Sequence, residues 1–364
     1  MIWKRQLVLK RLKQRELMFE LPNTPEIHRL ALTIGAFVAI AYRDRYGVIP
    51  GGVIVPGFII TLFLLSPIWC ITSLALSFSV YFIYKRFLQQ TSYKRRTPMY
   101  ILAFLSLAIA NSVAIIYIKL GWLYPSLDSL SGTLLPAVIA FTLTKQKLNK
   151  VIKAIVFTTL VTLAILIIIY LIGSSLFQID FDTLRAYYPT QEILRFDYHL
   201  FQFYVALGVG YLIYRFKDVR SGGYMVAPVA AALLVKPISG VLFLIGCITV
   251  YLVVQTLCQF TLLIGLKRYA VALFFSTLFI WVTELIFINL GFNILPFQGG
   301  NLFVIVAMMS YVNDSILYAN KNVMIYMILT ISTALITFFV AHTVAVYLTP
   351  PSTQGFVTKG TTRQ

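Results

Sequence analysis

Long apolar segments separated by short polar ones run along almost the whole chain. In the first half they lie at roughly 28–42, 48–65, 67–84, 99–118, 131–144 and 151–174. After a polar stretch they return at roughly 198–214, 223–236, 237–258, 269–291, 301–318 and 323–348. A helix needs about 20 residues to cross a membrane, and the second and fifth segments of each set are short or interrupted. The pattern predicts an all-α, polytopic helical membrane protein with about 8–12 membrane segments.

The two sets of segments match each other at a constant offset. Val55 and Val226 are 171 positions apart, and so are Pro125 and Pro296. Several matches at one offset, with the segments in the same order, predict two modules that arose by tandem duplication. The predicted organisation is a basic amphipathic segment at 1–27, a first module at 28–174, a polar linker at 175–197, a second, diverged module at 198–349 and a polar tail at 350–364.

One membrane-depth stretch contains an unusual number of helix-breaking residues. Residues 46–67 read YGVIPGGVIVPGFIITLFLLSP. Glycine and proline interrupt helices, and irregular backbone at membrane depth is tolerated where it is buried in protein or lines a wet cavity. The stretch therefore predicts a broken or re-entrant helix. The simpler alternative is a kinked helix that packs closely through its glycines.

Composition and charge agree with a membrane protein. The 364 residues are 59% hydrophobic and 12% charged, against about 25% charged in a soluble domain. The net charge of +18 fits the positive-inside rule and contact with anionic membrane lipids. It also fits a polyanionic path or partner, and charge alone leaves both open. We expect no nucleic-acid partner.

The stretch DRYGVIPGGVIVPGF at 44–58 resembles the signature of the CapC/PgsC capsule-biosynthesis family, the small membrane subunit of poly-γ-glutamate synthesis. The similarity continues through the basic turn YKRRTPMY at 93–100 and through residues 135–172. The second module resembles a diverged second copy. It lacks a counterpart of Pro50, and Ala307 stands in place of Pro136.

The resemblance implies a membrane subunit of a complex that makes and exports an anionic glutamate polymer. In that family the catalytic partner is a separate cytoplasmic ATP-dependent Mur-like amide ligase, and a further membrane-anchored capsule protein completes the set. The family-motif and broken-helix residues are Asp44, Gly47, Pro50, Gly51, Gly52, Pro56, Gly57 and Pro136, with Gly222, Gly223 and Pro228 in the second module. Two alternatives stay open: an autonomous secondary transporter for a small anion, and a non-conducting membrane scaffold.

The sequence contains no recognisable catalytic, metal or cofactor site. It has no GxxxxGK[ST] phosphate loop and no GxSxG nucleophile elbow. The three histidines, His28, His199 and His342, have no Cys or Glu at metal-ligand spacing. We therefore expect a non-catalytic subunit, with the ligase activity in a partner.

Basic turns and a few charges inside apolar segments are the candidate functional residues. Arginine binds carboxylates bidentately and lysine acts as a point charge, so basic turns are candidate contacts for a polyanion or a partner: Lys94, Arg95, Arg96, Lys267 and Arg268, with Lys145, Lys147, Lys150 and Lys153 as a further cluster. Positive-inside anchoring is the alternative. Glu284 and Asp314 are candidates for an intramembrane polar site. They would otherwise pair with a lysine or bond to a neighbouring helix.

The charge distribution also predicts an orientation. The basic N-terminal segment predicts a cytoplasmic N-terminus, and the resemblance implies the inner (plasma) membrane of a bacterium. This orientation requires that 48–65 dips into the membrane and returns to the outer side. If 131–144 then crosses fully, the two modules are inverted relative to each other; if it is re-entrant, they are parallel. The charge rule favours inversion.

Overall fold

The computed structural model describes residues 24–89, 97–120, 127–176, 196–217, 223–234, 237–292, 295–297 and 301–348. Within these ranges the chain is helical and has no strand, which confirms the all-α prediction. Five helices are long and apolar enough to cross a membrane: Pro67–Leu88, Thr97–Tyr117, Leu148–Gly173, Ile238–Phe260 and Leu266–Asn289. Shorter apolar helices accompany them at Val55–Leu65, Met225–Leu234, Leu302–Leu317 and Ile328–Val340.

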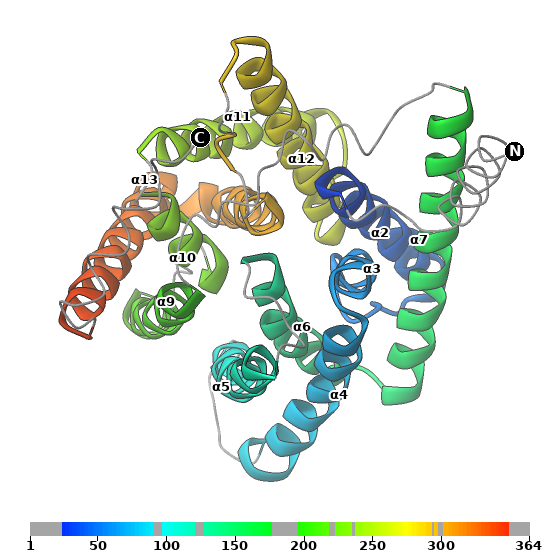
Figure 1. Ribbon diagram of the computed structural model, residues 1–364, viewed down its shortest axis with the longest axis horizontal. Coiled ribbons are helices and arrows are strands. Elements are labelled where there is room, and N and C mark those ends of the chain that lie inside the picture. The colour runs from blue at the N-terminus through cyan, green and yellow to red at the C-terminus, as the bar shows by residue number, and fades with distance from the viewer. Residues whose placement is uncertain are drawn as a thin grey trace, which may run out of the picture.

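The first module contains six helices and one π-helical turn (Figure 1). In chain order they are α2 (Pro25–Tyr46), α3 (Val55–Leu65), α4 (Pro67–Ile83) with η2 (Tyr84–Leu88), α5 (Thr97–Lys119), α6 (Leu127–Leu143) and α7 (Leu148–Leu176). Local sequence explains the boundaries. Pro25 starts α2, and Gly47 ends it with a left-handed φ of 69°. Ser66 separates α3 from α4, where its side chain accepts a hydrogen bond from the Trp69 N–H.

The second module repeats this order. It contains α9 (Phe196–Lys217), α10 (Gly223–Leu234), α11 (Pro237–Phe260), α12 (Leu266–Asn289) and α13 (Asn301–Leu348). Helices α2 and α9 differ by 171 positions at both ends, and the starts of the paired helices are 168 to 174 positions apart along the module. Common ancestry of the two modules remains a prediction, and the equal spacing supports it.

Helix α13 corresponds in order to both α6 and α7, and it is sharply bent. The rings of Tyr311 and Tyr326 lie 5.7 Å apart, centroid to centroid. In a straight helix, residues 15 positions apart are separated by about 22 Å along the axis. The bend therefore replaces the turn at Thr144–Lys147 that separates α6 from α7 in the first module. The two segments predicted at 301–318 and 323–348 form one continuous, bent helix.

Two reciprocal antiparallel contacts join the modules. Helix α2 packs on α12 and α5 packs on α9, so each module contributes the same pair of helices to the two seams. In Figure 1 the paired elements lie on opposite sides of the centre, for example α3 and α10, or α4 and α11. This is the isologous arrangement expected for two similar units around a two-fold axis.

Equivalent helices of the two modules run in the same direction. Gly57 of α3 packs against Ala31 and Gly35 of α2, and Ile60 clusters with Ile27, so α3 runs antiparallel to α2. Helix α4 folds back on α3, where Cys70 Sγ donates to the Ile59 carbonyl. Helix α5 is antiparallel to α4, since Tyr117 near its end contacts Trp69 near the start of α4. Helix α9 is antiparallel to α5, so it runs the same way as α2. The modules are therefore parallel. The inversion favoured by the charge rule is wrong, because the stretch 47–65 runs back across the bundle to the side where α2 begins.

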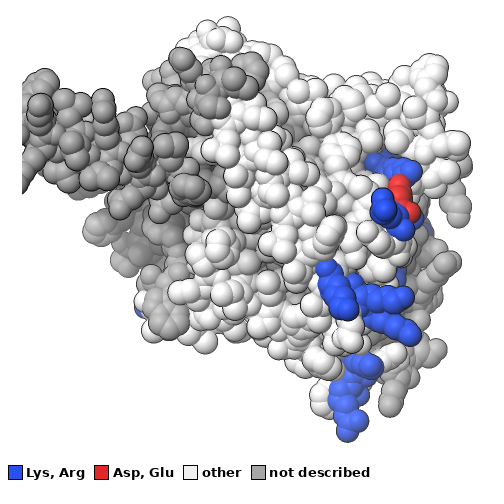
Figure 2. Space-filling view, turned by 90° about the vertical axis from the view of Figure 1, so that its right-hand side faces the viewer, with Lys and Arg blue, Asp and Glu red and all other residues white. Residues whose placement is uncertain are grey.

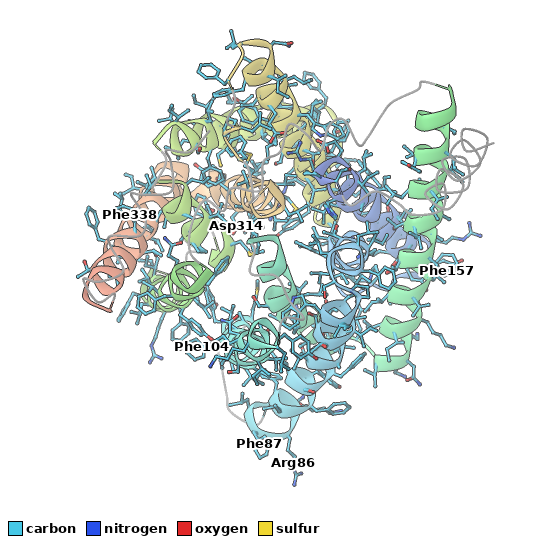
Figure 3. The ribbon with its side chains drawn as sticks, in the orientation of Figure 1. Arg86, Phe87, Phe104, Phe157, Asp314 and Phe338 are labelled. Carbon is cyan, nitrogen blue, oxygen red and sulfur yellow. The ribbon has the colours of Figure 1, made fainter. Side chains whose placement is uncertain are left out.

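The centre of the molecule is packed and its outer surface is apolar. Helices α6 and α13 contact each other, and every residue from Leu302 to Met309 is buried. Phe87, Phe104 and Phe157 project from the periphery in Figure 3 and are 72, 53 and 50% exposed. Exposed aromatic and aliphatic side chains around a packed helical bundle form the surface that contacts lipid acyl chains.

Candidate functional site

The stretch from Gly47 to Ile54 is non-helical backbone between α2 and α3. Pro50, Gly51, Val53 and Ile54 are buried, and α3 begins only at Val55. Gly51 and Gly52 have φ angles of 71° and 151°, which favour glycine because side chains with a Cβ are strained there. We call residues 47–54 the extended segment. It occupies the place at which the sequence predicts a broken helix.

Polar side chains from the α6–α7 region hold the extended segment. Thr142 Oγ1 donates to the Gly51 carbonyl at 2.6 Å, and the Ile49 N–H donates to Gln146 Oε1 at 3.2 Å. Apolar contacts fill the rest, since a Cβ on Gly52 would lie 2.8 Å from Val138 Cγ1. Backbone groups outside helices need such partners when water is excluded.

Removal of the Thr142 hydroxyl should loosen this segment. A Thr142→Val change keeps the shape of the side chain but leaves the buried Gly51 carbonyl without this donor. We expect a loss of about 1–3 kcal/mol in unfolding free energy, measured as a lower thermal transition in detergent. Thr144→Val is the matched control, because the exposed Thr144 hydroxyl bonds only to the Phe141 carbonyl of its own helix end. Equal transitions for the two variants would contradict the role of Thr142.

Close glycine packing places α3 against α2. A Cβ on Gly35 would lie 2.5 Å from the backbone nitrogen of Gly57, and a Cβ on Gly57 would collide with the Ala31 carbonyl oxygen. Pro56 is near the N-terminus of α3, where the missing N–H costs little. The stretch 46–67 thus shows a feature of each alternative predicted from the sequence: its helix is interrupted, and its glycines allow two helices to pack closely.

Positive side chains gather at one end of the helical bundle, beside the extended segment. All but Arg29 and Lys119 of the Lys and Arg side chains that the structure describes lie at this end, which we call the basic face: Arg43, Arg45, Lys85, Arg86, Lys145, Lys147, Lys150, Lys153, Arg215, Lys217, Lys267 and Arg268. Figure 2 shows Lys and Arg grouped at one edge of the surface, next to a broad area without charge. Lys145, Lys147, Lys150 and Lys153 are exposed, and the first two flank Gln146.

Some of the predicted contact residues already have partners within the protein, and Lys145 Nζ lies 4.0 Å from the centroid of the Phe141 ring. Lys267 Nζ lies 2.9 Å from Asp44 Oδ2, so these two motif positions form an exposed ion pair across the α2–α12 seam. Arg268 Nε donates to Asn313 Oδ1 at 2.8 Å. Both residues therefore also contribute to packing between helices. Lys94, Arg95 and Arg96 lie outside the described residues.

The remaining motif positions are distributed through both modules. Pro136 lies inside α6 and Pro228 lies inside α10. Gly223 is the first residue of α10, and Gly222 lies outside the described residues. The extended segment thus contacts the end of α6, whereas Asp44 pairs with Lys267 of α12. The second-module positions Gly223 and Pro228 lie in α10, on the opposite side of the bundle from α3 (Figure 1).

Glu284 forms a buried bidentate ion pair with Arg29. Arg29 Nη1 lies 2.7 Å from Glu284 Oε2, and Nη2 donates to Oε1 at 2.8 Å. The side chains are 0 and 3% exposed. The pair joins α2 to α12 at the end of the seam opposite the basic face. Its two guanidinium–carboxylate contacts have the bidentate geometry that arginine forms with carboxylates.

Asp314 is buried inside the bend of α13. Figure 3 shows it in the interior, whereas the labelled phenylalanines lie at the periphery. It is 4% exposed, and Tyr326 from the other arm of the bend is close enough to interact with it electrostatically. The bend therefore brings an acidic group and two tyrosines together, although 12 residues separate Asp314 from Tyr326 in the chain.

Sequence reasoning did not identify Arg29, Thr142 and Gln146, which form polar contacts between distant helices or with the extended segment. Arg29 stands at the start of an apolar segment, where a charge is usually taken as the end of a span; its place inside PEIHRLALTIG was the available signal. Thr142 and Gln146 carry no motif, and only the fold brings them to the extended segment. No group of three or more potential metal ligands occurs within the described part of the chain.

The apolar outer surface, the long apolar helices and the charged end define a multi-pass membrane protein. The family model described as capsule biosynthesis CapC matches residues 34–152, from within α2 to within α7. This confirms the resemblance to that family over residues 34–152. No curated protein and no solved structure matches the chain.

Proposed function

We propose that this protein is the membrane subunit of a complex that synthesises and exports poly-γ-glutamate or a similar capsule polymer. The CapC match over residues 34–152 carries the proposal, because it covers the extended segment and three of the four turn lysines, Lys145, Lys147 and Lys150. The subunit itself is non-catalytic. A cytoplasmic ATP-dependent ligase of the Mur-like class supplies the amide-forming activity, and a further membrane-anchored capsule protein completes the complex.

The basic face supports an orientation and a partner. Positive charge concentrates on the cytoplasmic side of membrane proteins, so we place the basic face in the cytoplasm of a bacterial cell. The start of α2 then lies on the outer side. This differs from the cytoplasmic N-terminus expected from residues 1–23, which lie outside the described part of the chain. A cytoplasmic basic face can attract an acidic ligase surface or the anionic polymer itself.

The packed centre of the bundle supports docking of a partner rather than passage of polymer between the modules. Helices α6 and α13 meet along apolar surface, and Ala140, Ile305 and Met308 have no exposed area. A polyanion crossing between the modules would have to displace this contact. Docking of the ligase and capture of the polymer at the basic face require no such change.

A secondary transporter for a small anion is the alternative, and Asp314 is the observation that favours it. A buried carboxylate at membrane depth is a common element of ion-coupled transport. Substrate flux by the purified protein in vesicles, lost in Asp314→Asn, would support this alternative over a polymer-complex subunit.

The exposed lysines of the α6–α7 turn test the proposed function. Changing Lys145, Lys147, Lys150 and Lys153 together to Gln should leave membrane abundance near the wild-type level, since single exposed charges contribute at most about 1 kcal/mol to stability. Polymer per cell should fall by about tenfold or more, because many weak contacts with a polyanion or an acidic protein act together and weaken with salt. The paired measurement is immunoblotting of the membrane fraction and assay of capsule polymer.

The matched control replaces the same four lysines with Arg, which keeps the charge. It should retain most of the polymer. Loss of membrane abundance in the Gln variant would show that the lysines anchor topology instead. Unchanged polymer in the Gln variant would contradict a role for this turn in polymer production.

A further inference from the structure

The connection between α11 and α12 is one of the most exposed apolar surfaces of the described chain. Phe260, Leu262 and Ile264 are 81, 87 and 71% exposed. We call residues 260–264 the apolar turn. It lies at the basic end of the bundle, because Lys267 in the next turn of chain pairs with Asp44 at the end of α2.

The backbone of the apolar turn is hydrogen-bonded within itself. The N–H of Thr261 donates to the Leu257 carbonyl at 2.8 Å, that of Leu263 to Thr261 at 2.7 Å, and that of Ile264 to Leu262 at 3.2 Å. The Thr261 hydroxyl also donates to the Leu257 carbonyl, at 2.6 Å. A segment that leaves water must satisfy its polar groups internally, and the N–H groups of Thr261, Leu263 and Ile264 do so here.

The apolar turn continues the lipid-facing stripe of α11. Val241, Ile245, Ile248 and Leu252 are exposed at helical spacing, at 56, 47, 47 and 57%, and Phe260 extends this surface to the end of the helix. The 24 residues of α11 give a length of about 36 Å, against a hydrocarbon thickness of about 30 Å. The turn therefore lies near the boundary between acyl chains and headgroups.

The corresponding connection of the first module has the opposite chemistry. Residues 89–96 read QQTSYKRR, whereas residues 260–265 read FTLLIG. A connection in water is expected to be polar, like the first one. The second connection has apolar side chains in its place and retains Lys267 and Arg268 immediately after it, as in segments that lie in the membrane interface.

We propose that the apolar turn is inserted into the lipid leaflet on the basic side and anchors the second module there. Phe260, Leu262 and Ile264 contact acyl chains, and Lys267 lies at the level of the headgroups. The anchor is independent of the proposed role in capsule synthesis. It would hold the α11–α12 corner at a fixed depth in the leaflet.

Thiol labelling in vesicles tests this depth. The full chain carrying Cys258→Ser is reconstituted in phosphatidylethanolamine–phosphatidylglycerol vesicles, with Cys70 and Cys247 retained because both are buried. Leu262→Cys is compared with Lys150→Cys, which lies on the basic face, and with Leu252→Cys, which faces lipid in α11. N-ethylmaleimide crosses membranes but reacts with the thiolate, which forms in water; we expect Leu262→Cys to react about tenfold or more slowly than Lys150→Cys.

Labelling in SDS provides the control, since the introduced cysteines of the three variants should then react at the same rate. A Leu262→Cys rate close to that of Leu252→Cys supports the anchor. A rate within about twofold of Lys150→Cys would overturn it. If that fast labelling were blocked by an added soluble partner, the turn would instead be a protein-docking surface.

Discussion

Arg29→Met should destabilise the protein strongly, by about 3–5 kcal/mol in unfolding free energy. The change leaves the Glu284 carboxylate, which is 3% exposed, without the guanidinium that accompanies it. A buried charge that has lost its partner retains its desolvation cost and loses the compensating attraction. Thermal unfolding of the purified protein in detergent, followed by size-exclusion chromatography, measures the effect.

The double variant Arg29→Met/Glu284→Leu should recover most of this loss. Apolar side chains of similar volume often replace a buried ion pair at little cost. The exposed pair provides a second comparison: Lys267→Met should cost about 1 kcal/mol or less, since Lys267 and Asp44 are 49 and 41% exposed. If the double variant is as unstable as Arg29→Met, packing at these positions matters more than the charge balance.

Gly57→Ala should prevent normal assembly of the first module. The added Cβ would lie 2.5 Å from Leu32 Cα and collide with the Ala31 carbonyl oxygen. These are backbone atoms of α2, so no side chain can move aside to make room. We expect a cost of about 3 kcal/mol or more, and a large drop in the amount of folded protein in the membrane fraction, measured by immunoblotting and detergent size-exclusion chromatography.

Gly208→Ala is the matched control. Gly208 lies inside α9, and a Cβ there would meet no heavy atom within 4 Å. Alanine favours helix over glycine by about 1 kcal/mol, so this variant should be as abundant as the wild type or more so. Equal abundance of the two variants would mean that α3 can move away from α2, and that the close glycine contact is not required.

Hydropathy and helix breakers were sufficient to predict most of the elements. Apolar runs identified the helical segments, and the glycines and prolines of 46–67 located the interruption. The prediction of helix boundaries was less accurate in the stretch that contains several glycines and prolines. The second segment, expected at 48–65, is helical only from Val55, because Gly51 and Gly52 adopt positive φ and delay the start of α3.

The relative orientation of the modules could not be obtained from charge alone. The number of crossings depends on whether 47–65 runs across the bundle to the side where α2 begins. Hydropathy does not show this, because the stretch is part extended and part helical. Contacts of Gly57 with α2 and of Cys70 with Ile59 decide it. The candidate residues show the same limit: Glu284 was visible as a charge in an apolar run, but its partner Arg29 is 255 positions away.

The sequence by itself determined the class of protein, the helical segments, the position of the broken helix and the resemblance to CapC, because these follow from local composition and from short ordered motifs. Only the tertiary structure decided which charged side chains bind polar partners on other helices. Lys267, Arg268 and Glu284 bind Asp44, Asn313 and Arg29, while the lysines of the α6–α7 turn remain exposed. The reason is physical: the cost or benefit of a charge depends on its distance from a partner and from water, and the packing of distant helices sets both.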